Sequence, residues 1–388
     1  MTPAARYAGA IDVLDRMQDG ITAERALTAW GRENRYAGSK DRAAVRDHVF
    51  SVLRQKRSVA HLGGSSTPRG MVLGLLRAQG VDPDTVFGAG GYAPDALTAL
   101  EQETVQELPS DAVAHDLPDW LWPIWESDLG DDASTVARTQ QSRAPITLRV
   151  NLRQGTREAA MAELLETGIK TEPVFHSKTA LQVIENERRV LTSNAYLSGK
   201  VELQDFASQN AVAGLKLKAG GRVLDYCAGG GGKALAIADA YDVDVFAHDI
   251  APERTVDISA RAMRAGVKIH RLLTDEIAKQ EPFNLVFCDA PCTGSGTWRR
   301  TPEAKWALDS EKLLNFSHLQ LEVIQSAARY VCSGGQLVYA TCSVLRVEND
   351  DVVSAFLSAN SGWTLLHQDQ RLPDRDGDGF YFALLQKP

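Results

Sequence analysis

Apolar residues recur at three- and four-residue spacing through the N-terminal part of the chain, as in "AIDVLDRM" and "AVRDHVFSVLRQ". This spacing places them on one face of a helix and predicts helices over 3–18, 21–33 and about 40–58. The run "GSSTPRG" interrupts the pattern with turn-forming residues. The chain therefore opens with a small helical module.

A connector follows over 85–135, where the turn signals "GAGGYAP" and "LPSD" precede the aromatic run "LPDWLWPIWESDLGDD". We expect Trp120, Trp122 and Trp125 to pack in a core and not to form a base-stacking platform. Beyond the connector, "APITLRV" predicts a strand, and a helix begins near Thr156. A further strand follows the helix, and "ALQVIE" and "VELQDFASQN" then complete a small β-α-β unit over roughly 144–205.

From Gly221 onward, apolar strands alternate with helical segments: "RVLDYC", "DVFAHDI", "KIHRLLT", "NLVFCDAP" and "QLVYATCS". This alternation predicts a mostly parallel, doubly wound sheet, to which "WTLLHQ" and "GFYFALLQ" add an antiparallel edge hairpin. We therefore expect an α/β protein in three parts. They are a helical domain with its connector over 1–135, a small α/β domain over 136–205 and a doubly wound, Rossmann-like domain over 206–388.

The charge is uneven along the chain. Its net value of −8 argues against a polyanionic partner, but residues 1–80 hold thirteen Lys/Arg against seven Asp/Glu, whereas 81–135 hold thirteen acidic residues and no basic one. The basic helical module can therefore still meet a polyanion. Charged residues interrupt the apolar positions of the N-terminus, and no apolar run is long enough to cross a bilayer. We expect a cytoplasmic monomer without membrane contact.

All five cysteines lie in the C-terminal half, and their odd number without a secretory signal indicates free thiols. Without a chemical role, each cysteine would be a small buried apolar residue of the core. No metal site is predicted.

The segment "VLDYCAGGGGKALAIA" predicts a strand, a glycine loop and the start of a helix, which is where doubly wound sheets bind nucleotides. Gly229, Gly231 and Ala234 also fit the dinucleotide fingerprint, and Asp249 at the end of the next strand suits the ribose of NAD or of S-adenosylmethionine alike. A phosphate-binding P-loop is disfavoured because Ala234 stands where that motif needs Ser or Thr.

Two thiols and a carboxylate follow neighbouring strands: Asp289 and Cys292 in "NLVFCDAPC", and Cys342 in "QLVYATCS". A thiol has a chemical use here, because carbon 5 of a pyrimidine becomes nucleophilic once a thiolate adds to carbon 6. Asp289 can hydrogen-bond the cytosine at nitrogen 3 or at its amino group. The Asp/Asn-Pro-Pro-aromatic loop expected of amino-group methyltransferases is absent from this segment.

The segments "DAPCTGSGTWRRTPEAKW", "VYATCSVLRVEND" and "DGDGFYFALL" closely resemble the Fmu/Sun family of RNA 5-methylcytosine methyltransferases. The resemblance is strong across 200–388, weaker over 144–205 and only architectural for 1–135, where that family often has a NusB-like, RNA-binding helical domain. The resemblance implies a Rossmann-like methyltransferase domain that uses S-adenosyl-L-methionine as its cofactor. It also implies that the substrate is RNA of the small ribosomal subunit.

The resemblance also implies roles for single residues. Cys342 matches the nucleophile that attacks carbon 6, and Cys292 matches the thiol that assists breakdown of the covalent adduct. The positions that match the cofactor site are Cys227, Ala228, Gly229, Gly230, Gly231, Gly232, Lys233, Asp249, Asp275 and Asp289. Asp275 is alternatively a loop or helix-capping residue, and Lys233 a surface charge at a helix start.

The glycine loop departs from the family pattern Cys-Ala-Ala-Pro-Gly-Gly-Lys-Thr. Gly229 and Gly230 replace Ala-Pro, and Ala234 replaces Thr. We expect a loop that is more flexible when empty, with an effect on cofactor affinity and not on reaction type.

Four basic residues lie near the cysteine loops in sequence and are predicted to hold RNA phosphates: Arg299, Arg300, Lys305 and Arg346. The substrate base has to leave its stack to reach a thiol. Three alternatives stay open. These are an NAD-dependent oxidoreductase, a catalytically inactive RNA-binding protein, and an enzyme acting on DNA with Cys292 as nucleophile.

Overall fold

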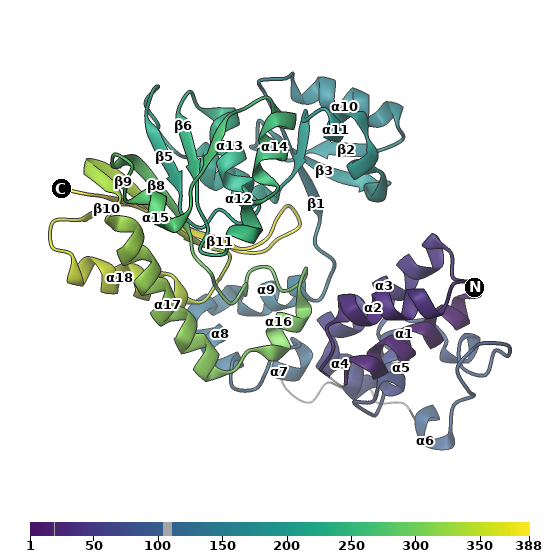
Figure 1. The fold of residues 1–388 in the computed structure, drawn as a ribbon. Coiled ribbons are helices and arrows are strands. Elements are labelled where there is room, and N and C mark those ends of the chain that lie inside the picture. Colours follow the sequence, from purple (N-terminus) through teal and green to yellow (C-terminus); the bar gives the residue numbers. More distant parts are fainter. Residues whose placement is uncertain (19, 104–110) are drawn as a thin grey trace. The chain divides into compact units, whose positions relative to one another are not determined.

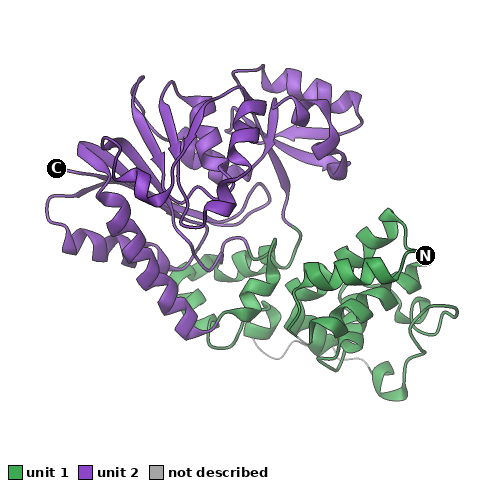
Figure 2. Cartoon of the chain, in the orientation of Figure 1, with its two compact units in different colours: residues 1–143, 298–308 green, residues 144–297, 309–388 purple. Residues whose placement is uncertain are grey.

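The computed structural model describes residues 1–18, 20–103 and 111–388. The chain forms two compact units, which Figure 2 colours separately. Unit 1 contains residues 1–143 and 298–308, and unit 2 contains residues 144–297 and 309–388. Most of the predicted turn "LPSD" lies outside the described residues. No helix in the described parts of the chain is long and apolar enough to cross a membrane.

Unit 1 is helical. Its helices are α1 (Pro3–Met17), α2 (Ala23–Glu33), α3 (Ser39–Arg54), α4 (Lys56–Leu62), α5 (Pro68–Ala78), α6 (Ala99–Gln102), α7 (Asp111–Ala114), α8 (Trp122–Leu129), α9 (Ala133–Gln140) and α16 (Pro302–Ala307) (Figure 1). Thr2 caps α1, where its hydroxyl accepts a hydrogen bond from the Ala5 amide at 3.2 Å, and Pro3 occupies the first helical position. Apolar faces of α1, α3 and α5 form one core in which Val13, Val49 and Leu73 are fully buried.

The segment 298–308 reaches unit 1 from a distant part of the sequence. The Trp298 indole stacks on that of Trp125 at a centroid distance of 5.8 Å, and the Trp306 Nε1–H donates to the Leu53 carbonyl at 2.7 Å. The Glu303 carboxylate accepts a hydrogen bond from the Ala23 amide at the start of α2. These contacts make α16 part of the helical unit, although the sequence on both sides of it belongs to unit 2.

The N-terminal part of unit 2 is a small antiparallel sheet in the order β2-β3-β1-β4. Its elements are β1 (Ile146–Val150), α10 (Arg157–Glu166), β2 (Lys170–Pro173), β3 (Ala180–Glu185), α11 (Asn194–Leu197) and β4 (Val201–Leu203). Thr156 caps α10 by accepting from the Ala159 amide at 3.1 Å. The buried ion pair between Arg149 and Asp239 joins this sheet to the rest of unit 2.

The larger sheet of unit 2 has seven strands in the order β10-β11-β9-β8-β5-β6-β7. The strands β5 to β9 are parallel, and β11 joins β9 antiparallel. The strands are β5 (Arg222–Asp225), β6 (Asp244–Ala247), β7 (Ile269–Arg271), β8 (Phe283–Asp289), β9 (Val331–Thr341), β10 (Thr364–Arg371) and β11 (Phe380–Gln386). Near-continuous apolar runs form the central strands because both of their faces are buried.

Helices cover both faces of this sheet (Figure 1). They are α12 (Phe206–Ala213), α13 (Gly232–Ala240) and α14 (Ile258–Ala265) on one face, and α15 (Thr274–Ile277), α17 (Ser310–Ala328) and α18 (Asp350–Ala359) on the other. The predicted doubly wound α/β fold and the antiparallel edge hairpin are confirmed.

Several helix predictions need adjustment. The helix expected over 40–58 breaks at Gln55, where α3 ends and α4 begins, and α9 runs across the boundary predicted at 135. Trp122 and Trp125 are buried as expected, whereas Trp120 is half-buried. The predicted boundaries at 135 and 205 stay predictions.

Candidate active site

The central strands β5 and β8 lie side by side, and the chain continues from them in opposite directions across the sheet. Ligands bind beyond the carboxyl ends of strands at such a switch point. The glycine loop follows β5, Asp289 ends β8, and Cys342 directly follows β9, which is paired in parallel with β8. The fold therefore places the glycine loop, Asp289 and Cys342 beyond the carboxyl ends of neighbouring strands of one sheet, and Figure 1 shows how these strands are arranged.

The glycine loop has two residues in the left-handed region, Gly229 with φ +50° and Gly231 with φ +81°. A Cβ at position 231 would lie 2.7 Å from Ile258 Cγ1, so a larger residue there meets both backbone strain and a clash. Gly229 stands where the Fmu/Sun pattern has alanine, and its backbone conformation favours glycine. Gly230 has an ordinary φ, and its carbonyl accepts a hydrogen bond from Arg261.

Asp249, directly beyond β6, holds the glycine loop in place. One carboxylate oxygen accepts a hydrogen bond from the Gly229 amide at 2.9 Å and the other from the Ala251 amide at 3.0 Å. The guanidinium of Arg254 lies 3.3 Å away. The side chain is 2% exposed. A carboxylate has about four acceptor sites, so these contacts leave capacity for ribose hydroxyls.

Lys233, in the first turn of α13, forms an ion pair with Asp289. Burial alone lowers the pKa of Lys233, but the nearby carboxylates of Asp289 and Asp225 raise it above its usual value, so the ammonium stays charged. Asp225, the last residue of β5, accepts a hydrogen bond from the Ala234 amide at 3.0 Å. Burial raises the pKa of Asp225 to about 7, with Lys233 opposing that shift and Asp289 adding to it.

The Sγ atoms of Cys292 and Cys342 lie 3.2 Å apart, within hydrogen-bond distance. The hydrogen bond with Cys342, followed by burial, raises the pKa of Cys292 well above its usual value, so Cys292 keeps its proton. The charge of Lys233 also interacts with Cys342, and the Thr297 hydroxyl lies 3.9 Å from the Cys342 sulfur. One thiol of the pair can therefore donate to the sulfur of the other.

Glu348 links the two cysteine loops through hydrogen bonds. Its fully buried carboxylate accepts hydrogen bonds from the amide of Thr293 at 2.8 Å, from the hydroxyl of Thr293 and from the hydroxyl of Ser343. The Gln320 side-chain amide adds a further donor at 2.9 Å. Thr293 and Ser343 directly follow Cys292 and Cys342, so one carboxylate fixes the spacing of both loops.

Comparisons with known proteins show the family to which the chain is similar. A family model described as "16S rRNA methyltransferase RsmB/F" matches residues 212–386, and one described as "Methyltr_RsmF/B-like, ferredoxin-like domain" matches residues 117–190. Ribosomal RNA small subunit methyltransferase B of Vibrio cholerae is 31% identical over 311 residues, which cover 76% of this chain and 71% of that protein. Its counterpart from Xylella fastidiosa strain 9a5c is 32% identical, with coverage of 79% and 77%.

The chain belongs to the RsmB/F family of 16S rRNA methyltransferases. The predicted membership of the Fmu/Sun family is thereby confirmed. The fold is also shared with the crystal structure of PH0851, with a TM-score of 0.78, 22% identity and coverage of 100% and 99%. A methyltransferase homologue from Pyrococcus horikoshii gives a TM-score of 0.62 at 21% identity, with coverage of 72% and 98%.

As an RsmB/F family member, the chain is a methyltransferase that uses S-adenosyl-L-methionine, and the NAD-dependent alternative is set aside. The residues fit this cofactor. The glycine loop leaves its backbone open to close approach by a ligand, Asp249 retains acceptor capacity for a ribose, and the Lys233–Asp289 pair interacts electrostatically with the two thiols.

Asp275 has a different environment from the other predicted cofactor residues. It is 74% exposed in the first turn of α15 and forms an ion pair with Lys279 at 3.2 Å. Its neighbour Thr274 lies closer to the site, with its hydroxyl 3.0 Å from Nε2 of His248, the residue before Asp249. A cofactor contact of Asp275 stays a prediction.

The RNA-contact prediction is wrong for two of its four residues. Arg299 is 2% exposed and Lys305 1% exposed, because both pack inside unit 1. The Lys305 ammonium donates to the Arg54 carbonyl at 3.2 Å, and the Arg54 guanidinium donates to the Arg299 carbonyl at 2.7 Å. Arg300 and Arg346 are exposed, and their contact with RNA stays a prediction.

Sequence reasoning missed two residues of this site, Asp225 and Glu348. Asp225 left a signal, because it is a carboxylate that ends an otherwise apolar strand directly before the glycine loop. Glu348 left none, because only the structure shows that it is fully buried.

Proposed function

We propose that the chain transfers a methyl group to carbon 5 of a cytosine in RNA of the small ribosomal subunit, through a covalent bond between Cys342 and the base. Relatives named ribosomal RNA small subunit methyltransferase B, at about 30% identity over most of the chain, support the substrate class. The single observation that carries the reaction type is the thiol pair at 3.2 Å beside the Lys233–Asp289 ion pair.

The thiol of Cys342 solves the problem that carbon 5 is a weak nucleophile. After its proton has passed to water, the sulfur forms a bond to carbon 6, and the electron pair of the carbon 5–carbon 6 double bond becomes available at carbon 5. S-adenosyl-L-methionine would supply the electrophilic methyl group, with S-adenosylhomocysteine as the leaving group. Loss of the carbon 5 proton to water then restores the double bond and breaks the sulfur–carbon bond, so that Cys342 leaves as a thiolate.

The neighbouring groups act on the sulfur of Cys342 at the start and at the end of this cycle. The charged ammonium of Lys233 attracts negative charge at Cys342. Cys292, which keeps its proton because its pKa is raised, donates a hydrogen bond to the departing sulfur. Cys292 thereby assists breakdown of the adduct. Asp289, oriented by Lys233, is available to hydrogen-bond the cytosine.

The product of the reaction tests this proposal. The purified chain is incubated with small-subunit ribosomal RNA and methyl-labelled cofactor, and the RNA is digested to nucleosides. We expect label in 5-methylcytidine, none with Cys342→Ala, and wild-type levels with Cys332→Ala, which alters a half-buried cysteine at the other end of β9. Label in another nucleoside, or in DNA and not in RNA, would contradict the proposal.

A further inference from the structure

A cavity of about 590 Å³ opens in unit 1, and it holds none of the residues of the methyl-transfer site. Its lining comes from α4, from α5 and the turn before it, from α7 and the stretch before α8, and from α16 with the residue after it. The residues that line it are Lys56, Arg57, Ala60, His61, Ser66, Met71, Val113, Pro118, Asp119, Trp120, Trp306 and Leu308. Cavities of roughly 300 to 1,000 Å³ hold small molecules or single nucleotides.

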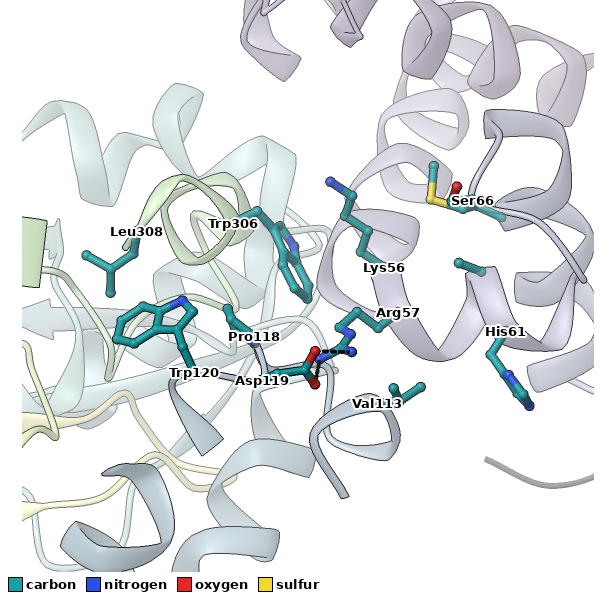
Figure 3. Close-up of a pocket in the computed structure, with 12 residues that line it drawn as sticks. Lys56, Arg57, His61, Ser66, Val113, Pro118, Asp119, Trp120, Trp306 and Leu308 are labelled. Carbon is teal, nitrogen blue, oxygen red and sulfur yellow. Dashed lines mark hydrogen bonds and ion pairs between the residues drawn. The ribbon is translucent and has the colours of Figure 1, made fainter. Parts of the chain in front are cut away.

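One side of the cavity is aromatic. Figure 3 shows the indoles of Trp120 and Trp306 beside Pro118. Both side chains are half-buried, so each keeps an accessible part of its ring. The Trp306 indole is fixed by its hydrogen bond to the Leu53 carbonyl. Two oriented aromatic rings at a cavity wall offer flat surfaces on which a base can stack.

The other side of the cavity is basic, and α4 provides it. Lys56, Arg57 and His61 lie on the helix face that is turned toward the cavity in Figure 3. The Arg57 guanidinium is held by the Leu117 carbonyl at 2.6 Å and by the Asp119 carboxylate at 2.7 Å. Lys56 is exposed, with its ammonium 5.6 Å from the Trp306 ring centroid. This wall combines a guanidinium that is paired with Asp119 and the exposed ammonium of Lys56.

We infer that this cavity binds an unstacked nucleotide of the RNA substrate, with its base on Trp120 and Trp306 and its phosphate at the exposed ammonium of Lys56. Stacking surfaces next to flexible cations are the combination by which proteins hold single-stranded nucleic acid. An uncharged ligand would not explain the basic wall, and a purely electrostatic contact would not explain the indoles. The inference rests on the proposed function, because the RNA substrate supplies the occupant.

The position of Trp306 in the sequence adds a reason to expect RNA here. The segment 298–308 that carries it directly follows the loop of Cys292 and Thr297. A nucleotide bound on Trp306 is therefore held by the same stretch of chain that leads from the Pro-Cys loop. RNA bound in the cavity would thus contact the segment 298–308, which continues the chain from the Pro-Cys loop.

Binding of a short single-stranded oligocytidylate to the full chain tests the inference, measured by fluorescence anisotropy over a series of salt concentrations. We expect Lys56→Glu and Trp120→Ala each to weaken binding about tenfold, and Lys56→Glu to lower the salt dependence as well. The control is Lys40→Glu, which places the same charge change on an exposed residue of α3 outside the cavity and is expected to bind like wild type. Unfolding midpoints confirm that all variants are folded.

Ultraviolet cross-linking followed by peptide mapping gives an independent measurement. We expect a nucleotide on the peptides that contain Trp120 or Trp306. Wild-type affinity in both cavity variants, with cross-links only elsewhere, would overturn the inference even if the chain methylates cytosine. Weakened binding in the cavity variants would support it even if the methylated atom proves to be other than carbon 5.

Discussion

Glu348 shows how a single buried side chain sets the chemistry of the two thiols. Its carboxylate accepts hydrogen bonds from Thr293 and Ser343, the residues that follow Cys292 and Cys342, and from the side-chain amide of Gln320. A positioning residue of this kind acts on the spacing of reacting groups and not on the binding of substrate.

Replacing Glu348 is therefore expected to lower kcat more than it changes KM. Glu348→Ala removes acceptors from both loops, and we expect kcat to fall about 100-fold, as it does when reacting groups are misplaced by about 1 Å. Glu348→Gln keeps one acceptor oxygen and restores a large part of the rate. Steady-state kinetics measure both variants, with Glu322→Gln on the exposed side of α17 as control. A wild-type kcat in Glu348→Ala would show that the loops keep their spacing without it.

Asp225 gives the folded chain a pH dependence with a definite sign. Burial raises the pKa of this carboxyl from 3.8 to about 7, so the folded state binds its proton more tightly than the unfolded state does. Its contribution to the free energy of unfolding is complete below pH 3.8 and is lost as the pH rises toward about 7. Asp225→Asn is expected to flatten this dependence, because the amide does not titrate.

Denaturant unfolding of wild type and Asp225→Asn across that pH range measures the effect. Equal slopes of unfolding free energy against pH in the two proteins would contradict the assignment. A carboxylate oxygen of Asp225 that lacks a hydrogen-bond partner among the described residues fits a group that is protonated when folded.

Among the residues, the sequence was sufficient to predict the site members that belong to a recognisable motif. Cys292, Cys342, Lys233 and Asp289 come together as expected because parallel strands bring their carboxyl ends to one edge of the sheet. Glu348 was not predicted, because its role depends on side-chain contacts between loops that lie far apart in sequence.

Among the elements, the glycine loop and the helix that follows it depend on Gly231. This residue precedes α13 with a left-handed backbone, and a Cβ there would meet Ile258 at 2.7 Å. We expect Gly231→Ala to cost about 1–3 kcal/mol of strain and to weaken cofactor binding at least tenfold. Gly230→Ala is the matched control, because its φ is ordinary and its Cβ would meet only the flexible end of Arg261 at 3.0 Å.

Isothermal titration calorimetry with S-adenosylhomocysteine compares the two glycine variants. Equal affinities would mean that the loop adapts to a side chain at position 231. The structure also explains part of the departure from the family loop, because the left-handed φ of Gly229 disfavours the alanine found there in the Fmu/Sun pattern.

The segment 298–308 explains why two basic residues were assigned to RNA incorrectly. Their sequence position beside the Pro-Cys loop indicated an exposed substrate contact. The chain instead enters unit 1 at Trp298, where the aromatic and hydrogen-bond contacts of α16 bury Arg299 and Lys305. Nothing in local sequence periodicity reveals such a long-range packing partner.

Lys305 and Arg346 are therefore expected to behave differently when changed. Burial lowers the pKa of Lys305 to about 8. The free energy of unfolding is therefore expected to rise as the pH increases from about 8 toward 10.5. Lys305→Met is expected to remove that rise and to leave RNA affinity unchanged. Arg346→Ala is expected to weaken RNA binding, since the side chain is 58% exposed. Filter binding with ribosomal RNA separates the two. A loss of affinity in folded Lys305→Met and none in Arg346→Ala would reverse the assignment.

For the whole molecule, the strand alternation after Gly221 was enough to predict a doubly wound sheet with its edge hairpin. Sequence alone did not predict the division into units, because unit 1 is built from two separate stretches of chain. Nor did charge by itself define an RNA surface, since basic residues of the helical module pair with acidic ones, as Arg57 does with Asp119 and Arg69 with Glu101.

The central claim is that two thiols divide one covalent cycle, and a denaturing gel tests it most directly. Each variant is incubated with small-subunit ribosomal RNA, with and without S-adenosyl-L-methionine. The account predicts that Cys292→Ala accumulates a denaturation-resistant protein–RNA complex that depends on the cofactor, while turnover collapses, and that Cys342→Ala forms none. A trapped complex in Cys342→Ala and none in Cys292→Ala would contradict the account and would make the Pro-Cys thiol the nucleophile.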